Sequence, residues 1–369
     1  MDIQKKLNDS VTQGAVHGVI AAAATDKGIL FEGAAGDLKL NSVIWLASMT
    51  KAVAGAAAMQ MVEKGKLSLD APAADVLPEI GKKEVLVGID ADGTVHMRKP
   101  TRPITLRHLL THTSGMGYDT WNGDIFRYVK AKGPFKPATM AALSTPLLFD
   151  PGEQWQYSIS IDWAGLMVEK ASGKRLDRYL TENIFVPLDM VDTGFAISPG
   201  MRPRKVAVHV RKEGGGFTAT DHELNQTPEV FQGGGALYST VPDYLKFARA
   251  LLMGGAPILK PETVAEMFRN SMNEGVVCRP LKSYIPGRST DMNFVDGMTW
   301  GLTFMINPEA FPGRRSAGSL AWGGLANSYY WIDPVKKVTG VWATQLLPFN
   351  DPQAVAAFED FERAVYASL

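Results

Sequence analysis

The chain has 369 residues, of which 46% are hydrophobic, so it is long enough to bury the core of one large domain or two modest ones. Lys and Arg together number 38, as do Asp and Glu, which gives no electrostatic reason to propose nucleic acid or an anionic membrane as a partner. A small neutral molecule is the better expectation.

Cysteine content and hydrophobic runs indicate where the protein works. The one cysteine, Cys278, has no partner for an intramolecular disulfide, and the stretch MDIQKKLNDSV lacks the apolar run of a secretion signal. No stretch of the sequence approaches the roughly 18 to 20 apolar residues of a membrane span. We therefore expect a cytoplasmic protein without a membrane partner, and the oligomeric state stays open.

The first part of the chain predicts a hairpin followed by a helix. Residues 16–36 hold two apolar runs separated by the turn sequence DKG, a pattern that favours an antiparallel hairpin. A helix is expected at 48–64, closed by Gly65.

The rest of the chain predicts helices first and strands later. From about residue 80 a polar, turn-rich stretch leads into TLRHLLTH, PATMAALST and DWAGLMVEKASG, which have helical spacing. Two further helices, PDYLKFARALLMGG and KPETVAEMFRN, precede the strand-like runs SLAWGG, SYYWIDP and VTGVWATQLL and a final amphipathic helix. The long loop at 277–298 is typical of the border of an active site.

These elements predict an α+β fold. The N-terminal hairpin and the C-terminal strands would form one antiparallel β-sheet flanked by helices, with a mainly helical domain inserted. The expected division is a discontinuous sheet domain, residues 1–80 and 230–369, and an inserted helical domain, residues 81–229. The cleft between them would have Ser48 at its floor, and such clefts favour small-molecule sites.

A serine and a lysine lie three residues apart at the start of the helix predicted at 48–64. Lys51 is on the same helical face as Ser48, so it could remove the serine proton and make the hydroxyl a stronger nucleophile. The lysine must be neutral to do this, and burial favours the neutral amine. Because a helix start also favours serine as a cap, this pair alone does not decide between a structural and a catalytic role.

Further stretches occur in an order that supports the catalytic role. They are ITLRHLLTHTSGM (104–116), DPGEQWQYS (150–158), GGGALYSTVPDYLKFARALLMGG (233–255) and TWGLTF (299–304). Together with Ser48 and Lys51 they resemble the serine β-lactamase and penicillin-binding protein superfamily, and within it the class C-like esterases called family VIII carboxylesterases. The resemblance extends from about residue 15 to about residue 345 and implies a serine β-lactamase-like fold.

The resemblance implies three catalytic residues. Ser48 matches the acylated nucleophile and Lys51 the motif lysine. Tyr157 matches the second-motif tyrosine, which shares a proton with the lysine in that superfamily. A phenol and an amine that both hold their protons near pH 10 exchange one only where the site lowers a pKa.

The third motif of that superfamily corresponds to WGGL at 322–325. Trp322, Gly323 and Gly324 are therefore expected to bind substrate, with the two glycines letting it approach the backbone closely. For the side chain of Trp322 alone, ordinary strand packing is an equally good interpretation. The backbone N–H groups of Ser48 and Leu325 are expected to form an oxyanion hole.

Two departures from the lactamase pattern bear on the substrate. Trp322 replaces the lysine that would pair with a substrate carboxylate, and Ile159 replaces an asparagine that would bind an amide. This favours a neutral ester over a β-lactam or a D-Ala-D-Ala peptide. Aromatic residues that could form an apolar acyl or alcohol pocket, although core packing explains most of them as well, are Tyr118, Trp121, Phe135, Trp155, Trp300 and Tyr329.

Other kinds of site find little support. His108 and His112 are four residues apart, but HLLTH lacks the glutamate of the H-E-x-x-H zinc motif, so no metal and no cofactor are expected. The sequence has no G-x-S-x-G motif, which excludes the nucleophile elbow of α/β-hydrolases.

The sequence therefore predicts a serine carboxylesterase that hydrolyses neutral short- to medium-chain esters through an acyl-enzyme on Ser48. Alternatives with the same chemistry are an acyltransferase, in which an alcohol or amine replaces water, and a β-lactamase or D-amino-acid peptidase. The alternative from a different class is a non-catalytic small-molecule binding protein, which would not need Ser48, Lys51 and Tyr157 together. The expected partner is a small-molecule ester.

Overall fold

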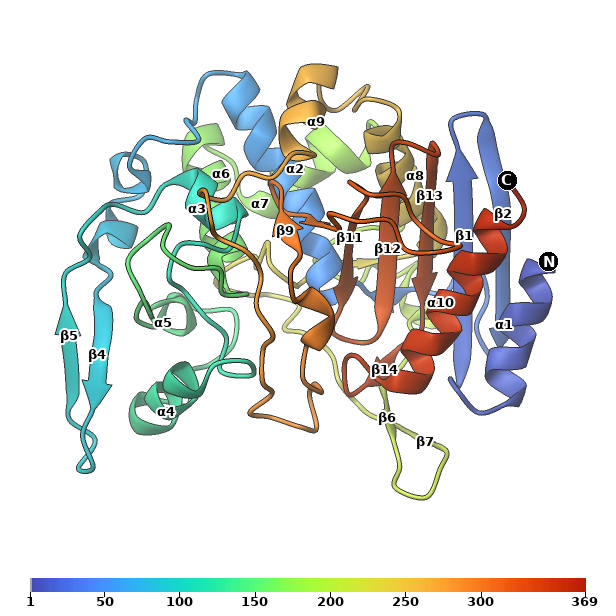
Figure 1. The fold of residues 1–369 in the computed structure, drawn as a ribbon, viewed down its shortest axis with the longest axis horizontal. Helices are drawn as coiled ribbons and strands as arrows, with labels where there is room; N and C mark the ends of the chain where they lie inside the picture. Colours follow the sequence, from blue (N-terminus) through green and yellow to red (C-terminus); the bar gives the residue numbers. More distant parts are fainter. Residues whose placement is uncertain (1) are drawn as a thin grey trace.

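A seven-stranded antiparallel sheet lies at the centre of the computed structural model, which describes residues 2–369 (Figure 1). Its strands are β1 (Gly18–Thr25), β2 (Gly28–Gly36), β9 (Thr299–Trp300), β10 (Met305–Ile306), β11 (Leu320–Gly324), β12 (Ser328–Asp333) and β13 (Val338–Ala343). Their order is β2-β1-β13-β12-β11-β10-β9, so the N-terminal hairpin pairs with the C-terminal strands through β1 and β13. The predicted α+β fold with an antiparallel sheet is confirmed.

Helices cover both faces of this sheet. They are α1 (Ile3–Thr12), α2 (Thr50–Glu63), α3 (Leu106–Leu110), α4 (Gly123–Lys132), α5 (Met140–Leu143), α6 (Ser160–Ser172), α7 (Leu176–Leu180), α8 (Val241–Leu252), α9 (Pro261–Met267) and α10 (Pro352–Tyr366). In Figure 1, α10 and α1 lie in front of the sheet, while α8 and α2 lie behind it. Within residues 2–369, no helix is both long and apolar enough to cross a membrane.

Short 3₁₀ and π turns complete the helical elements. They are η1 (Ala47–Met49), η2 (Ala73–Asp75), η3 (Pro78–Lys82), the π turn η4 (Thr181–Phe185), η5 (Arg202–Arg204) and η6 (Asn293–Val295). The helix predicted at 48–64 therefore begins with the turn η1 and continues as α2. Ser48 lies in η1 and Lys51 in the first turn of α2.

Short strands also lie outside the main sheet, and several of them fall between residues 81 and 229, the region expected to be mainly helical. The strands outside the main sheet are β3 (Ile44–Trp45), β4 (Val85–Ile89), β5 (Val95–Arg98), β6 (His209–Arg211), β7 (Phe217–Ala219), β8 (Tyr238–Ser239) and β14 (Leu346–Leu347). β4 pairs with β5, while β6 pairs with β7 and with β14. The β14–β6 pairing connects this region to the C-terminal part of the chain. The predicted domain boundaries stay a prediction.

Small side chains let α2 pack on every side. All its residues from Thr50 to Met61 are buried, as expected for a helix that is apolar around its whole circumference. A Cβ at Gly55 would lie 2.4 Å from Cγ2 of Thr303, so only glycine allows this close approach. A Cβ at Gly324 would likewise lie 2.3 Å from the carbonyl oxygen of Leu46. The end of β11 is therefore pressed against the turn that carries Ser48.

Candidate active site

Lys51 is at the centre of the hydrogen bonds around Ser48. Its Nζ lies 3.1 Å from Oγ of Ser48, 3.1 Å from the hydroxyl of Tyr118 and 2.6 Å from the carbonyl oxygen of Gly234. The side chain is only 1% exposed. These three contacts use all three donor positions of a charged lysine. In its neutral form, the nitrogen of Lys51 would instead accept a hydrogen bond from one of the two hydroxyls, which is the arrangement that a general base needs.

The residue before the serine has an unusual backbone conformation. Ala47 has a φ of 45°, in the left-handed region that favours glycine, and its side chain is buried. Non-glycine residues persist in this region only where the surrounding structure holds them there. The turn η1 therefore fixes Ser48 at the cost of local strain, a feature that no motif in the sequence indicates.

Tyr157 is beside Lys51, but its hydroxyl bonds elsewhere. The Tyr157 ring centre lies 4.8 Å from Nζ of Lys51, while its hydroxyl accepts a 2.9 Å hydrogen bond from Nε1 of Trp322. The hydroxyl that bonds to Lys51 belongs to Tyr118, which the sequence indicated only as a pocket residue. Desolvation, followed by the charge of Asp162, raises the pKa of Tyr118 well above its usual 10. Tyr118 therefore keeps its proton at neutral pH.

Asp162 is a buried acidic residue that the sequence analysis did not identify. Its Oδ1 accepts a 2.7 Å hydrogen bond from the backbone N–H of Gly234, whose carbonyl oxygen accepts from Lys51. Burial raises the pKa of Asp162 to about 6, and the charge of Lys51 partly opposes this shift. The signal in the sequence was an acidic residue within the apolar stretch SIDWAGLMV of α6.

A small cavity of about 160 Å³ opens beside the serine. It brings together Ser48 and Leu325, the two residues predicted to supply the oxyanion hole, with Tyr118 and Trp121. The loop predicted to border the site contributes Arg288, whose NH1 lies 3.5 Å from Oδ1 of Asp119. The full set of lining residues is Trp45, Ala47, Ser48, Tyr118, Thr120, Trp121, Asp162, Leu224, Gln232, Gly234, Gly235, Arg288 and Leu325.

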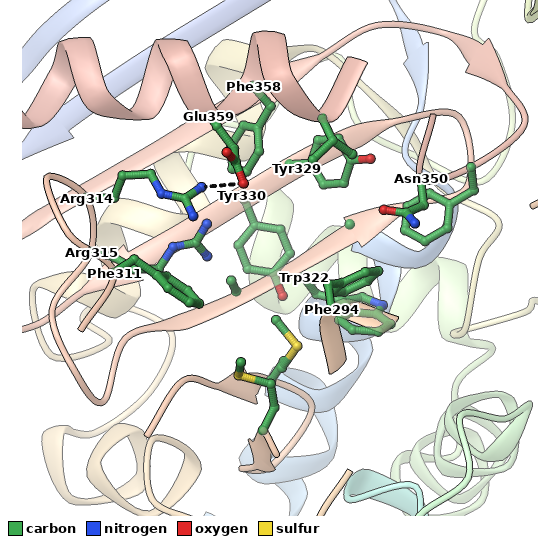
Figure 2. Close-up of a pocket in the computed structure, with 16 residues that line it drawn as sticks. Phe294, Phe311, Arg314, Arg315, Trp322, Tyr329, Tyr330, Asn350, Phe358 and Glu359 are labelled. Carbon is green, nitrogen blue, oxygen red and sulfur yellow. Dashed lines mark ion pairs between the residues drawn. The ribbon is translucent and has the colours of Figure 1, made fainter. Parts of the chain in front are cut away.

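Trp322 and Gly323 do not line the cavity beside Ser48, and the substrate-binding role expected for them and for Gly324 stays a prediction. Trp322 and Gly323 line a second cavity, shown in Figure 2, instead of the one beside Ser48. A Cβ at Gly323 would lie 2.8 Å from the ring of Tyr329, and Gly324 packs against Leu46. Close packing thus accounts for both glycines, which the sequence analysis had explained by substrate access.

The six candidate aromatic residues do not form one pocket. Tyr118 and Trp121 line the Ser48 cavity, and their rings pack edge to face with 5.7 Å between centres. Trp155 packs on Trp300 at 5.3 Å in a layer behind Tyr157. The other two are elsewhere: Phe135 stacks on Tyr128, and Tyr329 lines the second cavity.

The two histidines of HLLTH have separate structural partners. Nδ1 of His108 accepts a hydrogen bond from the backbone N–H of Thr105 and caps α3. Nδ1 of His112 lies 3.1 Å from Oγ of Ser158 and 3.0 Å from Oγ of Ser160. Burial, with the nearby charge of Lys51, holds the pKa of His112 well below 6.5. His112 is therefore neutral, and its ring packs 4.8 Å from that of Tyr157.

The chain belongs to the Beta-lactamase family, which matches residues 3–364. Monacolin J acid methylbutanoyltransferase of Aspergillus terreus (strain NIH 2624 / FGSC A1156) is 33% identical over 348 residues, covering 89% of this chain and 83% of the relative. Lovastatin esterase of Penicillium rubens is 31% identical, covering 93% of this chain and 90% of the relative. The solved structure of unliganded selenomethionyl simvastatin synthase (LovD) from Aspergillus terreus has a TM-score of 0.85 at 28% identity, covering 99% and 97%.

These similarities confirm the superfamily and the serine β-lactamase-like fold that the motifs predicted. The chain is a hydrolase or acyltransferase of this superfamily.

Proposed function

We propose that this chain transfers an acyl group from an ester, through Ser48, to an alcohol. The observation that carries the proposal is the continuous hydrogen-bonded path from Ser48 to Lys51 to Tyr118 on the wall of a cavity. Similarity to a methylbutanoyltransferase and to an esterase supports acyl transfer. The sequence-based prediction of short-chain hydrolysis thus becomes the second candidate.

The first half of the reaction forms the acyl-enzyme. Oγ of Ser48 attacks the ester carbonyl while its proton passes to neutral Lys51. The oxygen that becomes negative is stabilised by the backbone N–H groups of Ser48 and Leu325. The C–O bond of the ester then breaks, and the proton returns through Lys51 and Tyr118 to the departing alkoxide. The acyl group stays on Ser48.

The second half repeats these proton movements with the acceptor. The acceptor hydroxyl loses its proton to Lys51 and attacks the acyl carbon, and Ser48 leaves and regains a proton. The aromatic walls formed by Tyr118 and Trp121 favour an organic acceptor over bulk water. Hydrolysis is the second candidate because Thr120, Gln232 and Arg288 give the same cavity polar groups that hold water.

Arg288 extends the proposal to the kind of acceptor. The sequence favoured neutral substrates because Trp322 stands where lactamases carry lysine, but Arg288 brings a cation to the cavity from a different loop. The first relative acts, by its name, on an acid. Arg288 lies 3.5 Å from Asp119 and its side chain is 48% exposed, so it is more accessible than the tightly paired arginines of the protein interior and is able to bind the carboxylate of an acceptor that also has a hydroxyl. We also propose, as the sequence analysis expected, that the protein is located in the cytoplasm.

Product analysis separates the two candidate functions. The enzyme is incubated with p-nitrophenyl butyrate and increasing concentrations of 1-butanol, and butyric acid and butyl butyrate are measured by gas chromatography. We expect butyl butyrate to increase at the expense of butyric acid, and Ser48→Ala to form neither. Butyric acid alone at every butanol concentration would assign hydrolysis instead. An undiminished rate in the folded Ser48→Ala protein would refute both.

A further inference from the structure

A second cavity lies beside β11 and β12 and includes neither Ser48 nor Leu325 in its wall. Successive residues of a strand point to opposite faces, and in β11 Gly324 packs against Leu46 on the Ser48 side. Gly323 therefore points the other way, toward Tyr329, whose ring stacks on Phe358 of α10 at 4.8 Å. Gly323 and Tyr329 thus form the part of the wall on the side of α10, while Trp322 and Tyr330 line the cavity from the other face of their strands (Figure 2).

This cavity is large and mainly apolar. It has a volume of about 270 Å³, whereas voids in a protein core are seldom larger than a water molecule. An apolar cavity of roughly 150 Å³ is already enough to bind benzene in another protein. The aromatic and methionine side chains of its wall come from η6, β10, β11, β12, α10 and the loops between them: Phe294, Met298, Met305, Phe311, Trp322, Tyr329, Tyr330, Phe349 and Phe358.

The charged residues at the edge of this cavity neutralise one another. NH1 of Arg314 lies 2.9 Å from Glu359, the ion pair drawn in Figure 2. Arg315 makes a two-pronged contact with the fully buried Glu362, at 2.8 and 2.9 Å. Two cations therefore face two anions. A charged ligand would have to leave water without gaining a free partner, which is costly.

Trp322 connects this cavity to the candidate active site. Its indole lines the cavity, and its Nε1 donates to the hydroxyl of Tyr157. Phe294, whose ring centre lies 6.1 Å from that of Trp322, is 38% exposed although it is a large apolar residue on the cavity wall. A molecule in the cavity would cover Phe294 and touch Trp322.

We infer that this cavity is a second binding site, which takes a neutral, mainly hydrocarbon small molecule separate from the ester at Ser48. The wall supplies aromatic and thioether surface, the paired charges exclude ions, and neither Ser48 nor Leu325 contributes to the wall. The site does not depend on the chemistry proposed for Ser48.

Fluorescence titration of the folded Ser48→Ala protein tests this inference without any turnover. The neutral probe is N-phenyl-1-naphthylamine, and the matched anionic probe is 8-anilino-1-naphthalenesulfonate, which adds a sulfonate to the same ring system. We expect saturable binding of the neutral probe, at least about tenfold tighter than the anionic probe. Absence of saturable binding, or tighter binding of the anionic probe, would overturn the inference.

Cavity-filling variants locate the bound probe. Val355→Phe on α10 and Ala321→Leu on β11 place extra carbon atoms in the cavity, and each should weaken probe binding at least about tenfold. Ala356→Phe is the control, because this neighbouring residue of α10 is exposed. Circular dichroism identifies a variant that fails to fold. If one of the two filling variants does not fold, probe binding by the other one tests the site. Unchanged binding in a folded filling variant, or equal loss in Ala356→Phe, would place the probe elsewhere and refute the site.

Discussion

Removal of the Tyr118 hydroxyl is expected to lower turnover while leaving the fold intact. Tyr118→Phe deletes the partner that lies 3.1 Å from Nζ of Lys51. A hydrogen bond to a charged group contributes about 1.5–3 kcal/mol. If that energy is needed mainly in the transition state, kcat should decrease about 10- to 150-fold. Because this change leaves one donor of the buried Lys51 without its acceptor, the free energy of unfolding should also decrease, by about 1–3 kcal/mol, while Ser48 and Gly234 remain as partners.

Removal of the Tyr157 hydroxyl is expected to act differently. Tyr157→Phe leaves Nε1 of Trp322 buried without its acceptor, which should lower the free energy of unfolding by about 1–3 kcal/mol. Trp322→Phe removes the donor, so the double variant Tyr157→Phe/Trp322→Phe should be more stable than the sum of the single losses predicts. Urea unfolding followed by circular dichroism measures these differences.

Steady-state turnover of p-nitrophenyl butyrate by the same variants completes this test. The structure predicts that Tyr118→Phe has the larger loss of kcat relative to its loss of stability. A Tyr118→Phe enzyme with full kcat, beside a stable Tyr157→Phe enzyme that has lost 100-fold or more, would refute the Lys51–Tyr118 relay. Tyr157 would then be the proton partner of Lys51, as the resemblance implied.

Three further predictions follow from single residues. Ala47→Gly should keep activity and stability, because glycine adopts a φ of 45° without strain. Ala47→Val should lower the free energy of unfolding by about 2 kcal/mol or more and should also lower kcat. Wild-type urea unfolding and turnover in Ala47→Val would contradict this prediction. Burial, then the charge of His209, lowers the pKa of His17 to about 4 in the folded protein. Because His17 binds a proton in the unfolded chain below about pH 6.5 but in the folded protein only near pH 4, the free energy of unfolding should decrease by up to about 3 kcal/mol as the pH falls from 6.5 to 4. His17→Gln should remove this part of the pH dependence measured by urea unfolding. A variant as acid-sensitive as the wild type would contradict the prediction. Arg288→Gln should raise the KM for an alcohol that carries a carboxylate about two- to fivefold at low salt, and should leave the KM for 1-butanol unchanged. Lys282→Gln, at an exposed lysine, is the control. Equal effects of Arg288→Gln on both acceptors would exclude recognition of the carboxylate.

The sequence predicted β1, β2, β11, β12 and β13 because these strands have strong local signals, but it did not predict the two-residue strands β9 and β10. The hairpin of β1 and β2 has two apolar runs around a DKG turn, and the structure pairs Thr25 with Gly28 there. The helix α1 was missed because only Ile3, Leu7 and Ser10 are buried in an otherwise polar segment. The β4–β5 hairpin was missed because β4 is a short apolar run, VLVGI, without alternation, and β5, VHMR, is only four residues long.

Parts of the candidate site depend on contacts that no local pattern contains. The proximity of Ser48 and Lys51 follows from their helical spacing, so the sequence was sufficient. Which tyrosine hydroxyl reaches Lys51 depends on how two distant segments pack, and the resemblance to the superfamily's second motif favoured Tyr157 over Tyr118. The role of Asp162 was likewise missed, because its position in the apolar helix α6 does not show that it packs against Gly234.

Intact-protein mass spectrometry tests the central claim most directly. The enzyme is mixed with p-nitrophenyl butyrate, quenched in acid within the first turnover, and digested to locate the modified peptide. The account predicts a gain of one butyryl group on Ser48, which disappears when 1-butanol is added before the quench, and no gain in Ser48→Ala. A butyryl group on another residue, or rapid turnover by Ser48→Ala without acylation, would contradict it.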